Sequence, residues 1–213
     1  MDPRIHLSGA LLIVFASTGS AADLAPHEAV YELTLDEPTS GINGIDGRIA
    51  LRLTNETCDA RNLDYRFVAR FREDSEVTVT DQHTLSQESL SGQQFRFETK
   101  TMIDGAEQES VKGTAETNGD ATLVKFEQPV ARETEVSAAV FPMSHTAILI
   151  DKAKAGERIV ETSLYDGDKE PEKSLTTTAV ISPEVAPAAN EPNPTLAQLS
   201  NLRSWRISES YYN

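Results

Sequence analysis

The sequence has one cysteine among its 213 residues, Cys58, and therefore contains no C-x-x-C pair. The polar neighbours Asn55, Glu56, Asp59 and Arg61 indicate a turn, whereas the alternative is a buried thiol that packs as a small hydrophobic side chain. Nearby carboxylates also disfavour the thiolate and so weaken the nucleophile. In an exported chain, an odd cysteine indicates an intermolecular bridge, a reactive thiol or a disulfide partner outside the given sequence.

Long hydrophobic runs are also absent. The apolar run near the N-terminus, residues 10–16, is far shorter than the ~20 residues that span a bilayer. It follows Arg4 and precedes small residues that end at Ala22, a pattern that predicts a cleavable signal peptide over residues 1–22. The alternative is a buried N-terminal helix. No cysteine follows the run, which argues against a lipid anchor. We therefore expect export of a single mature domain, residues 23–213, with no transmembrane segment after cleavage.

Basic residues are scarce. Nineteen Lys and Arg stand against 34 Asp and Glu, which gives a formal net charge of −15. A surface this acidic repels phosphate backbones and anionic lipid head groups, so nucleic acid binding and electrostatic membrane docking are not expected. Hydrophobic residues make up 38% of the chain and the mean hydropathy is −0.38, which suits one globular domain.

The common signatures of active sites are missing as well. The sequence contains no G-x-S-x-G, no H-E-x-x-H and no glycine-rich phosphate loop. His27, His83 and His145 lie in separate contexts without the spacing of metal ligands. We therefore predict no catalytic residue, no cofactor-binding residue, no metal-binding residue and no cofactor.

The abundant acidic residues leave one enzymatic alternative open. "YDGDKEPEK" resembles the start of a calcium loop, but Pro171 stands where that loop needs glycine, so a hairpin turn is the better interpretation. Elsewhere, two facing carboxylates with one desolvated would favour a hydrolase acting on envelope polysaccharide. Closeness of carboxylates alone would not establish such an activity.

What the sequence does contain is a series of short alternating segments. "VYELTL", "RIALRLT", "LDYRFVARF" and "QQFRFETKTMID" each place apolar residues at every second position, and turn residues separate them. This period of two predicts a mainly β fold with an antiparallel sheet, as a barrel or a sandwich. Tyr65, Phe67, Phe95 and Phe97 face one side of that sheet, where they either form ordinary core or line a concave face.

One helix is expected near residues 144–155, in "FPMSHTAILIDKAKAGE". Ser144 is the predicted N-cap, Met143 is expected to pack against Ile148 as a hydrophobic staple, and Gly156 is the predicted stop. Because its first turns are apolar nearly all round, the helix is expected to be buried inside the curve of the sheet. The alternative is a helix that binds a membrane or a partner.

The C-terminal part begins with a segment rich in proline and alanine, residues 182–199, which shows no periodicity. It is predicted to be a flexible loop. A further strand is expected in "LRSWRISESYYN".

Three blocks of the chain resemble the EipB-like periplasmic proteins of alphaproteobacteria. They begin with "APHEAVYELTLDEPTSGINGIDGRIALRLTNETCDARNLDYRFVARF", continue with "FPMSHTAILIDKAKAGERIVETSLYDGDKE" and end with "SWRISESYYN". The resemblance covers most of residues 24–213 and depends on the order and spacing of these blocks. It implies a curved antiparallel sheet wound into an incomplete barrel, a β-spiral similar to lipoprotein-carrier folds, with one packed helix.

The same resemblance implies a non-enzymatic periplasmic protein that supports cell-envelope integrity. It implies a partner with tetratricopeptide repeats, or an envelope lipid or lipoprotein, as the bound molecule. It also implies a disulfide from Cys58 to a cysteine near the C-terminus of the family. Because no second cysteine occurs here, that partner is expected beyond residue 213, in a domain that is incomplete at its C-terminus.

Overall fold

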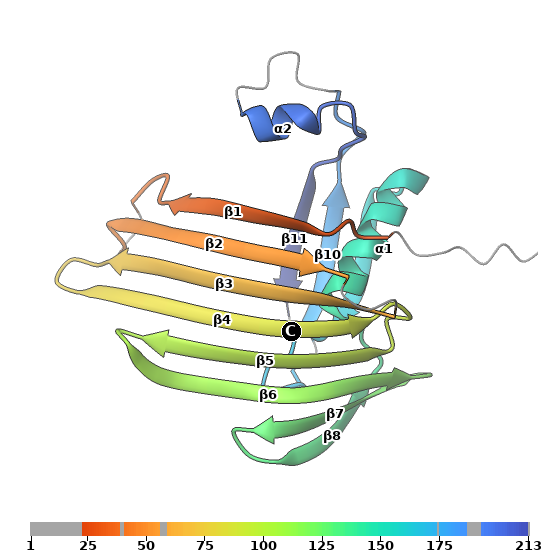
Figure 1. Ribbon diagram of the computed structural model, residues 1–213, viewed down its shortest axis with the longest axis horizontal. Helices are drawn as coiled ribbons and strands as arrows, with labels where there is room; N and C mark the ends of the chain where they lie inside the picture. The colour runs from red at the N-terminus through yellow and green to blue at the C-terminus, as the bar shows by residue number, and fades with distance from the viewer. Residues whose placement is uncertain (1–22, 39–40, 56–58, 174, 187–192, 213) are drawn as a thin grey trace, which may run out of the picture.

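The computed structural model describes residues 23–38, 41–55, 59–173, 175–186 and 193–212 (Figure 1). In chain order its elements are β1 (His27–Thr34), β2 (Gly44–Thr54), β3 (Ala60–Arg72), β4 (Val77–Ser89), β5 (Gln94–Ile103), β6 (Ala106–Asn118), β7 (Ala121–Gln128), β8 (Arg132–Ser137), α1 (Pro142–Ala155), β9 (Ile159–Leu164), β10 (Leu175–Ile181), α2 (Pro194–Gln198) and β11 (Ile207–Tyr212).

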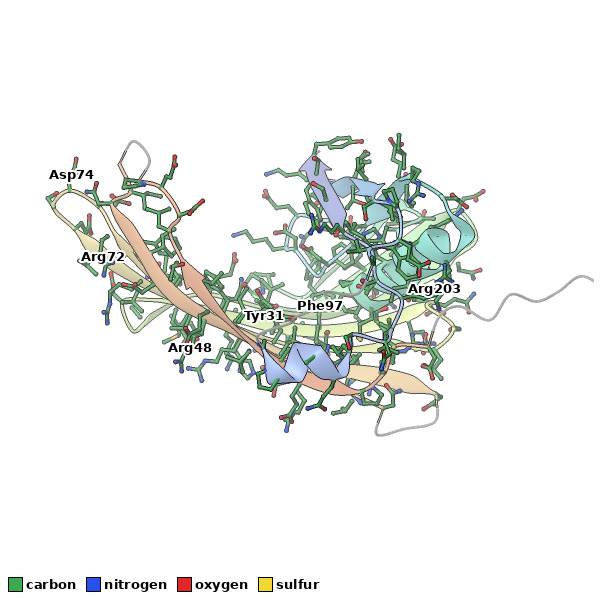
Figure 2. All side chains as sticks on the ribbon, turned by 90° about the horizontal axis from the view of Figure 1, so that it is seen from above. Tyr31, Arg48, Arg72, Asp74, Phe97 and Arg203 are labelled. Atoms are coloured by element: carbon green, nitrogen blue, oxygen red, sulfur yellow. The ribbon has the colours of Figure 1, made fainter. Side chains whose placement is uncertain are left out.

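The strands form two antiparallel sheets. The large sheet has eight strands in sequence order, β1 to β8, and the small sheet has three in the order β11-β10-β9. A parallel bridge between Val140 and Leu164 joins them next to β8, whereas β1 and β11 each pair along one edge among the described strands. The large sheet bends so that α1, β10 and β11 lie on its inner side (Figure 2). The prediction of a curved antiparallel sheet that forms an incomplete barrel is confirmed.

The core fills the space between α1, the small sheet and the inner face of the large sheet. Alternation along each strand sends one set of side chains to this face and the other set to solvent. The main cluster joins β5, β6 and β7 to the segment before α1 and to the residue after β9. It contains Phe95, Phe97, Val111, Ala115, Val124, Phe126, Ala139, Phe141 and Tyr165. Two smaller clusters lie on opposite sides of α1, one including Leu53 and Met143, the other including Leu149 and Ile181.

The helix begins earlier than the sequence indicated. Phe141 is the N-cap and Pro142 occupies the first turn, so the prediction of Ser144 as N-cap is wrong. Proline suits this position because its missing N–H would be unpaired there anyway. The predicted staple is also wrong, since Met143 packs with Leu53 in one cluster while Ile148 packs against the other. The helix ends as predicted at Gly156, which adopts φ 83°.

The segment predicted as a loop over residues 182–199 carries some regular structure. Residues 194–198 form α2, and Val185 bridges to Ser204 in antiparallel fashion. Residues 187–192 lie outside the described part of the chain. The strand expected in the last block is β11.

Gly113 in β6 is a position where a side chain has no room. A Cβ atom there would lie 2.5 Å from the carbonyl oxygen of Lys125 and 2.9 Å from the ring of Phe97. We expect Gly113→Ala to lower the free energy of unfolding by about 1–3 kcal/mol, because the neighbouring strand and the ring must both shift. Urea denaturation measures this loss, with Thr114→Ala on the adjacent residue as control. Equal unfolding midpoints for the two variants would contradict the prediction.

Candidate binding site on the inner face

The inner face of the large sheet has a covered end and an open part. At the covered end, Phe95 and Phe97 are 3% and 0% exposed and belong to the core. Further along the same face, Tyr65 and Phe67 are half-buried. Burial raises the pKa of the Tyr65 phenol above its usual value. Of the four aromatic residues predicted from the sequence as core or concave face, two are therefore core and two lie on the open part.

Three cross-strand rows make up this open part, which we call the open inner face. Each row takes one residue from β2, β3, β4 and β5 in that order, and almost all its side chains are half-buried. The rows are Gly47–Ala69–Thr80–Ile103, Ile49–Phe67–Gln82–Thr101 and Leu51–Tyr65–Thr84–Thr99. The next row includes Leu53 and Phe97, so the open inner face continues directly into the core.

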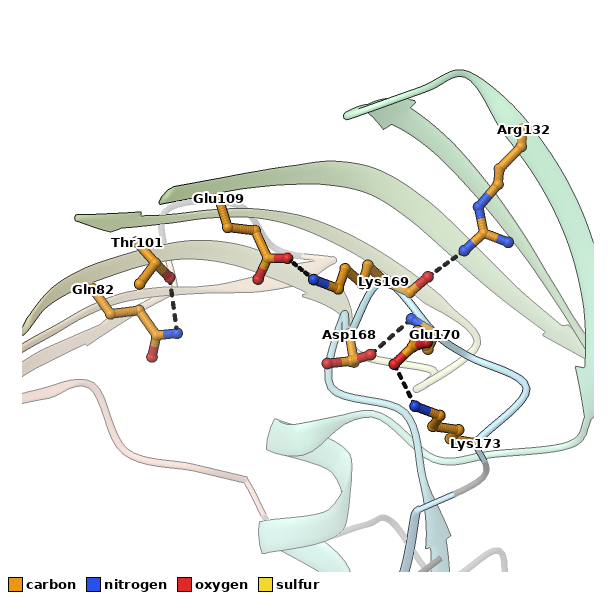
Figure 3. A network of polar contacts seen from close by, with 8 residues as sticks. All are labelled: Gln82, Thr101, Glu109, Arg132, Asp168, Lys169, Glu170 and Lys173. Carbon is orange, nitrogen blue, oxygen red and sulfur yellow. Dashed lines mark hydrogen bonds and ion pairs between the residues drawn. The ribbon is translucent and has the colours of Figure 1, made fainter. Parts of the chain in front are cut away.

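The connection between β9 and β10 borders the open inner face on the side of β6. Lys169 in this connection forms an ion pair with Glu109 of β6, and Arg132 of β8 donates to the carbonyl oxygen of Lys169 (Figure 3). Arg132 also pairs with Glu172 at 3.2 Å. The hydrogen bond with Glu109 raises the pKa of the Lys169 ammonium. These contacts tie the small sheet to the large one along the β8 side of the molecule.

The acidic residues of this connection stabilise its turns. The Asp166 carboxylate accepts a hydrogen bond from the backbone N–H of Asp168 at 3.1 Å, and the Asp168 carboxylate accepts one from the N–H of Glu170 at 2.7 Å. Both are side-chain turns of the kind that Asp commonly forms. The arrangement agrees with a turn, the preferred interpretation of "YDGDKEPEK". Among the described residues, no group of three or more His, Cys, Asp or Glu side chains is placed to hold a metal ion.

Glu88 is a buried carboxylate that sequence reasoning missed. It is 0% exposed and accepts hydrogen bonds from the backbone N–H groups of Met143 and Ser144, at 2.6 and 2.9 Å. The Ser144 hydroxyl donates a third, at 2.8 Å. Arg61 lies opposite Glu88 in the strand register and is also buried. Burial raises the pKa of Glu88, and these hydrogen bonds and Arg61 oppose the shift. Glu88 thus caps α1 from β4 and is enclosed by protein groups.

His145 is the second residue whose role the sequence did not indicate. Its Nε2 atom lies 2.7 Å from a carboxylate oxygen of Glu209, so α1 is joined to β11. The side chain is buried, and its Nδ1 atom has no hydrogen-bond partner among the described residues. The separate sequence contexts of the histidines gave no sign of this contact, because Glu209 lies 64 positions further along the chain.

The outer face of the large sheet carries charged side chains in pairs. One hollow on this face has a volume of about 480 Å³ and lies over β2 to β6. Several lining charges are paired: Arg52 with Asp64 at 3.2 Å, and Lys112 with Glu98 at 3.8 Å. These pairs are exposed and so contribute little to stability. Because oppositely charged groups alternate here, the hollow offers no surface of one sign to a charged ligand.

Two predictions concern residues outside the described part of the chain. The signal peptide, residues 1–22, and Cys58 with its expected disulfide lie there, so they stay predictions. Within the described residues, no helix has the length and apolar character needed to cross a bilayer.

Comparison with known proteins identifies the fold and the family. The chain is 32% identical over 200 residues to the cell envelope integrity protein EipB of Brucella abortus (strain 2308), which covers 92% of this chain and 71% of that protein. It is similar to the crystal structure of a beta-barrel-like protein with a domain of unknown function from Brucella abortus. That similarity has a TM-score of 0.82 and 30% sequence identity, and covers 89% of this chain and 80% of the other.

The family model described as EipB-like matches residues 18–213, which include both sheets, α1 and the open inner face. The resemblance found in the order of the sequence blocks is therefore confirmed, and the chain belongs to the EipB-like family.

Proposed function

We propose that this protein acts in the periplasm, where it supports cell-envelope integrity by binding a partner protein or an apolar envelope component on the open inner face. The name of the Brucella relative supports the role in the envelope. The predicted signal peptide over residues 1–22 supports export, and together with a role in the envelope it supports a periplasmic location. The bound molecule is a protein with tetratricopeptide repeats, or an envelope lipid or lipoprotein.

This proposal depends on one observation, the partial exposure of the apolar side chains on the open inner face. Ile49, Leu51, Tyr65 and Phe67 are half-buried at the same face whose other end is packed core. When another apolar surface covers these partly exposed side chains, the free energy falls by roughly 25 cal/mol for each Å² of apolar surface removed from water. A bound molecule would provide that cover.

The enzymatic alternative has little support from the positions of the carboxylates. Glu88, the most deeply buried of those described, caps α1 and faces Arg61. Asp166 and Asp168 lie on one turn and bind its backbone N–H groups. Burial raises the pKa of the Asp166 carboxylate, but its neighbour Asp168 lies on the same turn and does not face it across a cleft. A non-enzymatic role is therefore the function that we propose.

Replacing Phe67 tests the proposal. We expect Phe67→Ser to weaken binding of the uncharged apolar dye Nile red roughly tenfold, because a partly buried aromatic contact is worth about 1.5 kcal/mol. The same variant should fail to restore resistance to detergents and cell-wall antibiotics in cells that lack the gene. Fluorescence titration and growth assays measure the two effects.

The matched control is Val68→Ser, one residue along β3 and therefore on the outer face. It should behave like the unchanged protein in both assays. If Phe67→Ser folds, binds Nile red and restores resistance as well as the unchanged protein does, the open inner face is not the binding site.

A further inference from the structure

Charge is strongly segregated between the two faces of β2 to β5. The three rows of the open inner face contain no charged side chain. The alternating rows on the opposite face contain charged groups and His83 at most positions: Arg48–Val68–Asp81–Met102, Ala50–Arg66–His83–Lys100 and Arg52–Asp64–Leu85–Glu98. The chain as a whole is 25% charged, so an inner face without charge is a specific property of this surface.

The open inner face is also divided lengthwise into two lanes. The lane on β2 and β3 is apolar, with Ile49, Leu51, Phe67 and the ring of Tyr65. The lane on β4 and β5 carries neutral polar groups at every position except Ile103, namely Thr80, Gln82, Thr84, Thr99 and Thr101. The two lanes lie side by side because β3 pairs with β4 along their whole length. A ligand that covers both must be apolar along one side and hydrogen-bonding, without charge, along the other.

The hydrogen-bonding capacity of the polar lane is only partly used within the protein. Gln82 donates to the Thr101 hydroxyl at 3.4 Å, a long contact, and the two side chains lie on the same side of the sheet as Glu109 and Lys169 (Figure 3). Thr84 and Thr99 share one hydrogen bond at 3.0 Å. A pair of hydroxyl groups that shares one hydrogen bond retains a second hydrogen to donate. The lane therefore offers donors and acceptors to a ligand.

The charged groups at the border of the open inner face are already neutralised. Glu109 is paired with Lys169, and Arg132 is paired with Glu172. A phosphate or carboxylate placed over the three rows would meet no cation among them, and removing its charge from water would be costly. An additional peptide strand is disfavoured for a different reason. This face presents side chains, and the backbone groups of β2 to β5 are already paired within the sheet.

We infer that the open inner face binds an uncharged lipid with hydroxyl or amide groups next to its acyl chain, a ligand of the ceramide or monoacylglycerol type. The acyl chain lies along β2 and β3, and the polar groups bond to Gln82, Thr84, Thr99 and Thr101. This inference depends on the proposed function, because it names the class of molecule bound at the same site.

The test compares two fluorescent lipids that carry the same labelled acyl chain, a ceramide and the anionic phosphatidylglycerol. The full chain should bind the ceramide at least roughly tenfold more tightly, the equivalent of one or two net hydrogen bonds. The double variant Gln82→Leu with Thr101→Val should bind the ceramide roughly tenfold more weakly than the unchanged protein does but keep its binding of Nile red. Thr114→Val, on the outer face of β6, is the matched control and should keep the preference.

The outcomes separate this inference from the proposed function. If Nile red binds at the open inner face but the two lipids bind equally well, or the anionic lipid binds better, the inferred class of ligand is wrong and the site remains. If a peptide and no lipid is found in the protein purified from its own periplasm, the lipid inference is likewise overturned. If neither lipid nor Nile red binds, the inference fails together with the apolar-ligand form of the proposed function.

Discussion

Replacing Phe97 by alanine is expected to lower the free energy of unfolding by about 3–5 kcal/mol. The side chain is 0% exposed, and its ring centroid lies 5.3 Å from that of Phe95, 5.7 Å from Tyr165 and 6.1 Å from Phe126. These rings come from β5, β7 and the segment after β9. Truncation would therefore leave a cavity where the two sheets meet. Urea denaturation followed by circular dichroism measures the loss.

The control for this variant is Phe67→Ala, the same substitution on the open inner face. Phe67 is half-buried, so removing its ring loses less buried apolar area than removing the ring of Phe97 and leaves no closed cavity. We expect a loss of about 1 kcal/mol. The two phenylalanines thus have different roles: Phe97 stabilises the fold, and Phe67 is available to a ligand. Similar losses for the two variants would show that Phe67 is as fully packed as Phe97, and would contradict the division of this face.

Alternation along the strands was sufficient to predict which residues share a face, but not which part of the face is covered. Tyr65, Phe67, Phe95 and Phe97 all follow the same period of two. What separates them is the position of Phe141 and Tyr165, which come from later in the chain and pack against Phe95 and Phe97. No local pattern in β3 or β5 encodes that placement. The fold class was therefore predictable, whereas the extent of the open inner face was not.

The buried polar residues were missed for a related reason. Glu88 stands in a strand with many polar residues, "VTVTDQHTLSQES", and nothing nearby distinguishes it from a solvated side chain. Its partner Met143 is 55 positions away. Serine favours the N-cap, so the local sequence predicts Ser144 at that position, but Glu88 provides the acceptors for the first turn of α1. A local preference was overridden by a tertiary contact.

The second large effect is expected at this same cap. Glu88→Ala should lower the free energy of unfolding by about 3–5 kcal/mol, because it removes the buried carboxylate that lies opposite the buried charge of Arg61 in the strand register. It also leaves the N–H groups of Met143 and Ser144 unpaired at the buried end of α1. Arg61 also forms an ion pair with Asp23 at 3.4 Å, but the Asp23 side chain is exposed. Urea denaturation near neutral pH measures the loss, and a loss below 1 kcal/mol would contradict it.

Glu88→Gln separates the charge of this residue from its shape. The amide oxygen of glutamine can accept from one backbone N–H, so we expect a smaller loss, about 1–3 kcal/mol. The pH dependence of the free energy of unfolding then shows whether the Glu88 carboxyl group is protonated or ionised in the folded protein. Because burial raises the pKa of Glu88, the folded protein holds this proton at pH values where the unfolded chain has released it.

The stability contributed by that proton is fully present below the ordinary glutamate pKa and is lost as the pH rises through the raised value. The advantage of the unchanged protein over Glu88→Gln should therefore shrink as the pH is raised across this window. An advantage that stays constant, or grows with pH, would mean that the interactions with Arg61 and with the end of α1 outweigh burial. Glu88 would then stabilise the fold as a permanently ionised group, and its pKa would lie below the ordinary value.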